Sequence, residues 1–369
     1  MKSNWQRADW PSFRYSPTRL DNVERRFLKG AGVIIGALHH VDPKARQGLT
    51  LHLISEETIE SSAIEGEILD RASVQSSLAR HLGLSTEKRR VGYAEAGAAD
   101  LAVDLYRHYS TPLEREVLFQ WHAMLMNGRR DIVDIGRYRT HDDPMQIVSG
   151  PLHAPRVHFE APPSSRVPME MQSFIDWFNA TGPGGTMPLG AITRAGIAHL
   201  WFESIHPFED GNGRIGRAIA EKALAQALDA PTLTALATTI HRHRKEYYEA
   251  LQKGSRGLEI DPWLGWFGEI VLQAQDRTFA AVHFLIAKAR TFDRLRGQIN
   301  DRQEKALLRM FAEGADGFKG GLSAHNYQTI TGAAPATTTR DLARLVELGA
   351  LRRTGEHRHA RYHLVLDKA

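Results

Sequence analysis

The segment from 189 to 228 constrains the fold more than any other part of this chain. Its first part, LGAITRAGIAHLWFESI, has Ile197, Trp201 and Ile205 on one helical face and stops before a histidine-proline pair. Its last part, AIAEKALAQAL, is rich in alanine and strongly favours a helix. Only the polar run HPFEDGNGRIGR, residues 206–217, separates them. The sequence therefore predicts two helices joined by a tight, glycine-containing turn.

Composition excludes several classes of site. The 369 residues include no cysteine, which rules out disulfides, thiolate metal sites and a cysteine nucleophile. The N-terminus lacks the apolar core of a signal peptide, and no run approaches the roughly 18 apolar residues of a membrane span. We expect a cytoplasmic protein that does not enter a membrane. The net charge of +4 is too small to identify a partner.

The distribution of patterns along the chain predicts a mainly α fold of three domains. Residues 1–105 read as an N-terminal helical domain behind an aromatic lead-in, and residues 106–290 form a helical core. Short β-like runs at 146–149 and 156–160 interrupt this core and predict a β-hairpin. Residues 295–369 form a separate C-terminal domain after a charged stretch that we expect to be a linker helix over 290–305.

The turn at 206–217 has the composition of an anion site. Gly211, Asn212 and Gly213 precede the second helix, where unpaired backbone N–H groups and the helix dipole favour a phosphate. Arg214 and Arg217 stand three residues apart, on one helical face, and guanidinium groups bind phosphate oxygens in pairs. These features predict binding of a polyphosphate.

Two further side chains supply chemistry. Asp210 is a hard oxygen ligand suited to Mg²⁺, and His206 can accept a proton from a hydroxyl group near neutral pH. Each residue alone also has a structural explanation; Arg217, for example, can pair with Glu221 one helical turn later. Their combination within twelve residues favours phosphoryl or nucleotidyl transfer.

The same residues resemble the signature H-x-F-x-D/E-G-N-G-R-x-x-R of the Fic family, which they match at every fixed position. The resemblance implies a helical enzyme that transfers AMP from ATP to a Ser, Thr or Tyr hydroxyl of a target protein and releases diphosphate. His206 would be the general base, Phe208 the anchor of the loop, and Asp210 the Mg²⁺ ligand. The resemblance implies these ATP- and phosphate-binding residues: Gly211, Asn212, Gly213, Arg214, Gly216 and Arg217.

Other segments extend the resemblance. A phosphorylating subgroup of the family has lysine where this chain has Gly213, so Gly213 favours AMP transfer. The predicted hairpin resembles the Fic flap, which would align a target segment by main-chain pairing. Tyr248 would contact the adenine, although paired tyrosines are as often core residues. These residues would form the target-docking surface of the flap: Met145, Ile147 and Val148.

The stretch SSAIEG places a carboxylate where a helix disfavours it. Gly66 is a typical helix terminator, so Glu65 lies in the last turn, where the dipole prefers a cation. Either the mismatch is tolerated on the surface or the carboxylate has a cation elsewhere. The stretch is similar to the Fic inhibitory motif S/T-x-x-x-E-G/N, here formed by Ser61, Glu65 and Gly66. That motif implies that Glu65 pairs with Arg217 and withholds it from ATP.

The C-terminal pattern of helices followed by two strands resembles a winged helix-turn-helix. We expect the side chains of residues 337–340 near DNA bases or a protein partner. DNA binding and protein docking both remain open. The predicted hairpin is basic, with these arginines and histidines: Arg352, Arg353, His357, Arg358, His359 and Arg361.

The resemblance leaves alternatives open. The chain can be a DNA-binding transcriptional regulator with a nucleotide-sensing Fic core, or a Fic enzyme with de-AMPylation activity that uses Glu65 as a base. Auto-AMPylation and a homodimer are further possibilities that the family suggests. The identity of the target protein cannot be read from the sequence.

Overall fold

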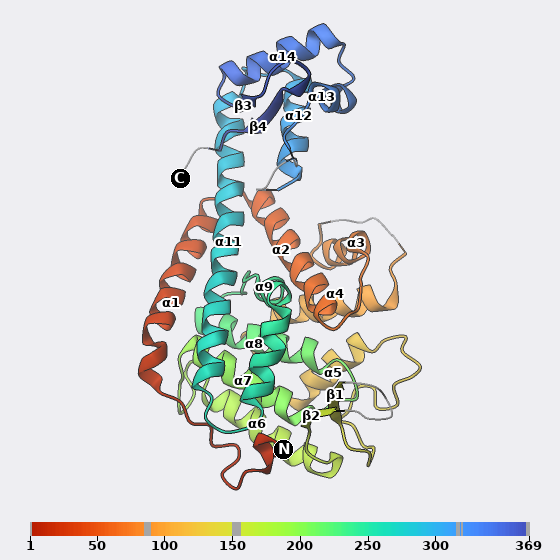
Figure 1. Ribbon diagram of the computed structural model, residues 1–369, viewed down its shortest axis with the longest axis vertical. Coiled ribbons are helices and arrows are strands. Elements are labelled where there is room, and N and C mark those ends of the chain that lie inside the picture. The colour runs from red at the N-terminus through yellow and green to blue at the C-terminus, as the bar shows by residue number, and fades with distance from the viewer. Residues whose placement is uncertain (1, 85–89, 150–155, 315–317, 319, 367–369) are drawn as a thin grey trace. The chain divides into compact units, whose positions relative to one another are not determined.

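Helices make up most of the structure, a computed structural model that describes residues 2–84, 90–149, 156–314, 318 and 320–366, without the side chains of 147–149, 156–158 and 358 (Figure 1). The chain divides into two compact units. Unit 1 comprises residues 1–36 and 50–278, and unit 2 comprises residues 37–49 and 279–369. The three domains expected from the sequence stay a prediction.

Unit 1 contains most of the elements. Within it lie η1 (Asn4–Gln6), α3 (Arg71–His81), α4 (Tyr93–His108), α5 (Arg115–Leu125), β1 (Gln146–Ser149), β2 (Arg156–Glu160), η2 (Ser164–Arg166), α6 (Val167–Ala180), α7 (Ala191–Ile205), α8 (Asn212–Leu228), α9 (Leu236–Arg242) and α10 (Arg244–Gly254). The helices with residues in both units are α1 (Pro17–His39), α2 (Pro43–Ile64) and α11 (Asp261–Leu295).

Helices α7 and α8 are the centre of unit 1, as the sequence predicts. They lie side by side, and every residue of α7 is buried (Figure 1). A helix that is apolar on all sides belongs in the interior of a domain. The aromatic rings of Phe174, Phe202 and Phe208 are fully buried around it. The turn between α7 and α8 is therefore fixed by the core on both sides.

The aromatic lead-in packs on this core. The rings of Trp10 and Phe13 contact Trp201 edge to face, with centroids 6.1 and 5.9 Å away. The Trp10 indole N–H also donates to Glu170 Oε2 on α6 at 2.8 Å. This mostly irregular segment is thus held on the core by ring contacts and by hydrogen bonds, among them the one from the Asn4 amide to Ser204 Oγ at 2.8 Å.

The predicted hairpin is confirmed. Strands β1 and β2 pair antiparallel, with Gln146 opposite Glu160 and a bulge between Ile147 and Val148. The pairing continues past the strands, where the N–H of Ala161 donates to the carbonyl of Met145 at 2.9 Å.

Unit 2 holds α12 (Asp301–Ala312), α13 (Ala324–Thr331), α14 (Pro335–Glu347), β3 (Leu351–Thr354), η3 (His357–His359) and β4 (Arg361–Leu364). Strands β3 and β4 form the expected hairpin, and Leu322 forms an additional bridge to Tyr362. The core of this unit includes Leu307, Leu342 and Leu345.

Two expectations about unit 2 are wrong. Residues 290–305 are not one linker helix, because α11 ends at Leu295 and α12 begins at Asp301. The side chain of Asn300 caps α12 by accepting from the N–H of Gln303, which favours a new helix start there. Thr338, which we expected near a partner, is 1% exposed and donates to the carbonyl of Ala334.

None of the helices in the described part of the chain combines the length and the apolar character needed to cross a membrane.

Candidate active site

The turn between α7 and α8 is built on two residues with left-handed backbone. His206 caps the end of α7 with φ of 50°, and Gly211 caps the start of α8 with φ of 79°. The second helix begins at Asn212, so Asn212 and Gly213 belong to its first turn rather than preceding it. Their N–H groups still lie at the helix N-terminus, where four such donors lack an intrahelical acceptor.

Internal hydrogen bonds hold the loop between these caps. The Asn212 side chain donates to the carbonyl of Phe208 at 2.9 Å and accepts from the N–H of Phe208 at 3.0 Å. Phe208 is fully buried, as the family resemblance implies, and its ring stacks on that of His122 with 4.2 Å between centroids. The side chain of Asn212 thus stabilises the loop, and only its backbone N–H is left for an anion.

Arg139 fixes the backbone at His206. This buried arginine donates from Nε to the carbonyl of His206 at 2.9 Å and from Nη2 to the carbonyl of Ile205 at 3.4 Å. Its own N–H donates to the carbonyl of Pro207 at 3.0 Å. These bonds stabilise a left-handed conformation that costs a non-glycine residue free energy.

The imidazole of His206 is half-buried and neutral. Burial and the nearby charge of Arg139 lower its pKa to about 4, against the opposite effect of Glu65 and Asp210. Its Nδ1 lies 3.8 Å from Glu203 Oε2. A neutral imidazole at physiological pH can accept a proton, which is the property that a general base requires.

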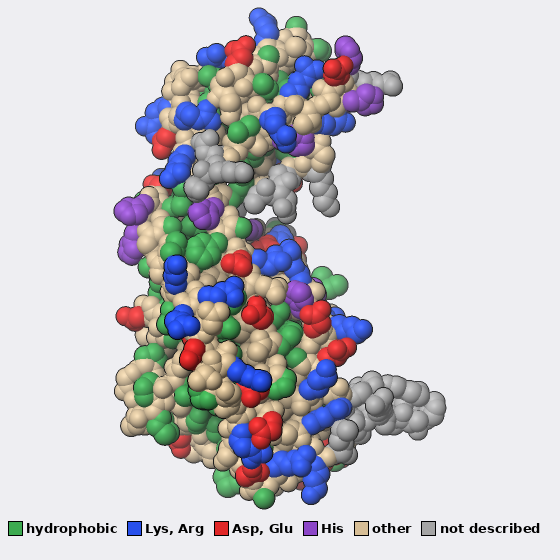
Figure 2. Space-filling view, turned by 60° about the vertical axis from the view of Figure 1, so that its left-hand side comes forward, with side chains coloured by type: hydrophobic (Ala, Val, Ile, Leu, Met, Phe, Trp, Pro, Cys, Tyr) green, Lys and Arg blue, Asp and Glu red, His purple; other side chains and the backbone are tan. Residues whose placement is uncertain are grey.

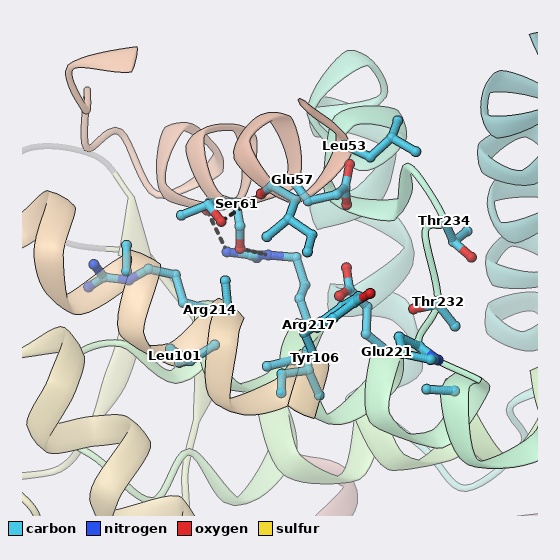
Figure 3. A pocket seen from close by; sticks show the side chains of 18 of the residues that line it. Leu53, Glu57, Ser61, Leu101, Tyr106, Arg214, Arg217, Glu221, Thr232 and Thr234 are labelled. Carbon is cyan, nitrogen blue, oxygen red and sulfur yellow. Dashed lines mark hydrogen bonds between the residues drawn. The ribbon is translucent and has the colours of Figure 1, made fainter. Parts of the chain in front are cut away.

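Arg217 is enclosed by the end of α2. Its Nη1 lies 2.8 Å from Glu65 Oε1. Its Nε donates to Ser61 Oγ at 2.9 Å, and Nη2 donates to the Ser61 carbonyl at 2.8 Å (Figure 3). Gly66 follows with φ of 86° and ends the helix as the sequence predicts. The carboxylate at the disfavoured helix end therefore has a cation, Arg217 of α8, which pairs with Glu65 rather than with Glu221 of its own helix.

Charge dominates this pair. Burial acts to raise the pKa of Glu65, yet Arg217 and Arg214 overcome it and hold the pKa below its ordinary value. The Arg217 side chain is 2% exposed. Removing one partner of a buried ion pair leaves an uncompensated charge, which is strongly unfavourable unless water or a new anion reaches it.

Gly213 provides the space for the carboxylate of Glu65. A Cβ atom at this position would lie 2.1 Å from Glu65 Oε1 and 3.1 Å from Arg217 Nη1. The first distance is shorter than any real contact, so a side chain here displaces Glu65. The position that the family resemblance gives to phosphate is thus filled by a carboxylate.

A second acidic residue engages the other arginine. Glu67 forms an ion pair with Arg214, whose side chain is 8% exposed. Residues 65–67 therefore neutralise both arginines of the turn. No sequence pattern predicted this second ion pair.

Asp210 lies at the edge of the turn and is partly exposed. Its carboxylate accepts from Arg129 Nη1 at 2.9 Å and lies 3.7 Å from Arg214 Nη2. No cluster of three or more potential metal ligands occurs among the described residues. A single carboxylate beside a phosphate position is nevertheless a donor set that suits Mg²⁺, which commonly binds one or two carboxylates and substrate phosphates.

Gly216 has a different role from the one that the motif implies. It faces α7, and a Cβ atom there would lie 2.5 Å from Glu203 Oε1 and 3.2 Å from His199 Nδ1. Gly216 thus allows two helices to approach closely and does not face the phosphate position.

The two tyrosines of α10 differ. Tyr247 is buried, and its hydroxyl lies 2.9 Å from His199 Nε2. Tyr248 is 40% exposed, and its hydroxyl donates to the carbonyl of Ile64 at 3.1 Å. Tyr248 also lines a cavity with Phe159 of β2 and Ser255, and its contact with adenine stays a prediction.

A pair of half-buried carboxylates lies one turn from Arg217. Glu57 on α2 and Glu221 on α8 point toward one another and share a hydrogen bond (Figure 3). Burial raises the pKa of Glu57 to about 7 and, together with Glu57, that of Glu221 well above its ordinary value. The Glu57 carboxylate also accepts from the N–H of Thr238 at 3.1 Å, at the start of α9. The carboxyl group of Glu221 therefore bonds to Glu57 of α2 and not to Arg217.

The flap residues are only partly described. Met145 precedes β1 and is partly buried, and Ile147 and Val148 lie in β1. The side chains of Ile147 and Val148 lie outside the described residues, so their proposed role in docking stays a prediction.

Comparison with known proteins identifies two segments. Residues 112–224 match the Fic/DOC family, and residues 3–84 match a domain family of unknown function, DUF4172. The first match contains His206, Asp210, Arg214 and Arg217, and the second contains Glu65.

Curated relatives agree. The chain is 27% identical over 200 residues to a protein adenylyltransferase of Caenorhabditis elegans, which covers 53% of this chain and 35% of the relative. It is 24% identical over 261 residues to a protein adenylyltransferase of Drosophila willistoni, covering 70% and 48%. The chain thus spans between about a third and a half of the length of these relatives.

Solved structures share the fold. A Fic family protein from Desulfovibrio desulfuricans superposes with a TM-score of 0.55 at 23% identity and covers 97% of this chain and 99% of that one. A Fic domain protein from Bacteroides thetaiotaomicron superposes with a TM-score of 0.53 at 17% identity and covers 69% and 96%. Both likenesses concern the fold.

Proposed function

We propose that this chain is a protein adenylyltransferase that transfers AMP from ATP to a hydroxyl side chain of a target protein, because its residues 112–224 match the Fic/DOC family. The observation that carries the proposal is the turn between α7 and α8. It combines free backbone donors at a helix start, two arginines and a neutral imidazole within twelve residues.

The chemistry follows from this arrangement. The nitrogen Nε2 of His206 takes the proton from the target hydroxyl while the hydroxyl oxygen forms a bond to the α-phosphorus of ATP. The bond from that phosphorus to the bridging oxygen breaks, and diphosphate leaves. The start of α8 and Arg214 stabilise the negative charge on the phosphates. Asp210 would hold Mg²⁺, which neutralises phosphate charge when bound.

In the described conformation Arg217 is not available to a nucleotide. Glu65 and Ser61 use its Nε, Nη1 and Nη2. We propose that this state is autoinhibited, because the γ-phosphate and the Glu65 carboxylate require the same guanidinium. Release of Glu65 is then the step that activates the enzyme.

The flap supports selection of the target. A two-stranded antiparallel hairpin has a free edge that can pair with an extended segment of another chain. We propose that β1 aligns the target hydroxyl with His206, and that a segment of another copy of this chain is one possible target.

Radiolabelled ATP tests the reaction type. With the Glu65→Gly protein and cell lysate, we expect protein bands labelled from α-³²P-ATP and none from γ-³²P-ATP, since AMP transfer retains only the α-phosphorus. Released diphosphate should increase in proportion to the labelled protein. Label from γ-³²P-ATP alone would show phosphate transfer and would contradict the proposal.

For the C-terminal part of unit 2 we propose a winged helix that binds DNA. Arg352 and Arg353 on β3 are exposed, and Lys and Arg side chains spread over the visible face of this unit with fewer Asp and Glu between them (Figure 2). Thr339 and Arg340 are the exposed residues of the predicted reading segment on α14.

A mobility-shift assay tests this second proposal. The Arg352→Ala/Arg353→Ala protein is expected to bind duplex DNA about tenfold more weakly than wild type at 100 mM salt, because each phosphate contact releases counterions. Arg296→Ala, an exposed arginine outside this hairpin, is the matched control. If wild type does not shift DNA at any salt concentration, the unit docks on protein instead.

A further inference from the structure

Helix α7 carries a row of polar side chains through the core. His199, Glu203 and His206 follow one another at spacings of four and three residues, so they share one face of the helix end. His199 and Glu203 are buried, at 0% and 8% exposure. Buried ionisable groups are costly unless they are paired, and the proposed chemistry so far uses only His206.

The members of this row lie within reach of one another. Nδ1 of His206 is 3.8 Å from Oε2 of Glu203, and their side chains are 18% and 7% exposed. Within the described part of the chain, His206 Nδ1 and Glu203 Oε1 are buried without a hydrogen-bond partner. The oxygen near Nδ1 is Oε2, and a small rotation of either side chain brings the unpaired Nδ1 within hydrogen-bond distance of this carboxyl; such bonds are often long before substrate binds.

The surroundings leave space for the Glu203 carboxyl and for little else. Gly216 faces it across the helix interface, where a Cβ atom would be 2.5 Å from Glu203 Oε1. His199, one turn earlier, is held by the Tyr247 hydroxyl at 2.9 Å. The carboxyl is thus confined between α7, α8 and α10, beside His206.

The charges around the row depend on the inhibitory pair. Burial and Glu65 raise the pKa of Glu203 to about 8, whereas Arg217 acts to lower it. When Glu65 departs, one of the groups that keep Glu203 protonated departs with it. The titratable and charged groups that face the row from the neighbouring segments are Glu65, Arg139, Asp210, Arg217 and Tyr247.

We propose that Glu203 is a positioning residue for His206 in the adenylyltransferase reaction. Its carboxyl oxygen accepts the Nδ1–H of the neutral imidazole, which keeps the lone pair on Nε2 and directs it to the target hydroxyl. When Nε2 takes the proton, Nδ1–H stays on the ring, and the adjacent carboxyl stabilises the imidazolium. This inference rests on the proposed function.

A competing role has a different kinetic signature. Glu203 also lines the cavity that Tyr248, Ser255 and Phe159 share, so it is within reach of a nucleotide bound there. A contact to the nucleotide would change KM for ATP. A contact to the base of the reaction changes kcat.

The test compares Glu203→Ala and Glu203→Gln in the Glu65→Gly protein. Alanine removes the acceptor, so we expect kcat to fall about 10- to 100-fold with KM for ATP unchanged, the usual effect of losing a partner that orients an active group. Glutamine keeps a carbonyl oxygen of the same size and should restore most of the rate. Because the pKa of Glu203 is raised to about 8, its carboxyl is uncharged where His206 titrates, so glutamine should leave the acid limb of the pH–rate profile in place.

The control and a readout other than activity separate this inference from the proposed function. Glu170→Gln changes a buried glutamate on α6 that pairs with Arg166, and should alter neither kcat nor the pH profile. Imidazole NMR should show His206 with its proton on Nδ1 in the parent and in Glu203→Gln, and a larger share with the proton on Nε2 in Glu203→Ala, whether or not AMP is transferred. Unchanged kcat and an unchanged His206 tautomer in Glu203→Ala, or a change in KM for ATP alone, would overturn the inference; transfer by a protein without His206 would instead overturn the proposed function.

Discussion

AMP transfer by the Glu65→Gly protein is expected to exceed that of wild type by about 10- to 100-fold at saturating Mg-ATP. The substitution removes the carboxylate that lies 2.8 Å from Arg217 Nη1, while the two contacts to Ser61 remain. A coupling of about 1–3 kcal/mol between an inhibitory contact and ligand binding corresponds to such a factor. The measurement is the initial rate of label incorporation from α-³²P-ATP.

A matched control lies on the same helix. Glu60 on α2 pairs with His241 of α9, outside the turn, so Glu60→Gln should leave the rate at the wild-type level. Adding Glu67→Gln to Glu65→Gly tests whether Arg214 is also restrained, and a further rise in rate is expected because Glu67 pairs with Arg214. Equal labelling by Glu65→Gly and wild type would show that Arg217 is not restrained by this residue.

Loss of the imidazole at position 206 is expected to lower AMP transfer by about 10²- to 10⁴-fold, the contribution that general bases typically make. The activated Glu65→Gly protein is the appropriate background, because the wild-type rate is low. His206 has φ of 50°, and asparagine tolerates this left-handed conformation better than alanine does. His206→Asn therefore removes the base with the least disturbance of the backbone that Arg139 holds.

Binding measurements distinguish a lost base from a lost site. His206→Asn should bind ATP within about twofold of the parent by calorimetry, because the backbone donors at α8 and the arginines are retained. His241→Asn, a histidine on α9 that pairs with Glu60, should transfer AMP at the parental rate. Full activity in His206→Asn would show that another group deprotonates the target.

Patterns among neighbouring residues predicted the secondary structure of the site. The two helices around 206–217, the end of α2 at Gly66 and both hairpins follow from spacing, glycine and turn chemistry. The pairing of Glu65 with Arg217 joins residues 152 positions apart, and it was expected only from the family resemblance.

The rest depends on which faces meet in the folded chain. Glu67 is an ordinary glutamate in the sequence, and its pairing with Arg214 arises because α2 ends over the start of α8. Nothing in the sequence around Arg139 indicates that its side chain binds the backbone of His206. Gly216 fitted the motif as a phosphate residue, but the helix turns it toward Glu203.

The space above Gly213 has a consequence for how the protein senses its nucleotide. One volume admits a single anion at a time, either the carboxylate of residue 65 or a phosphate oxygen. The two anions therefore compete for this space. The factor by which the Glu65 carboxylate weakens the binding of ATP equals the factor by which bound ATP weakens the contact of Glu65 with Arg217. Under the proposed inhibition, the position of Glu65 at the end of α2 therefore depends on the nucleotide concentration. A partner protein that displaces this segment would activate the enzyme without contacting the catalytic turn.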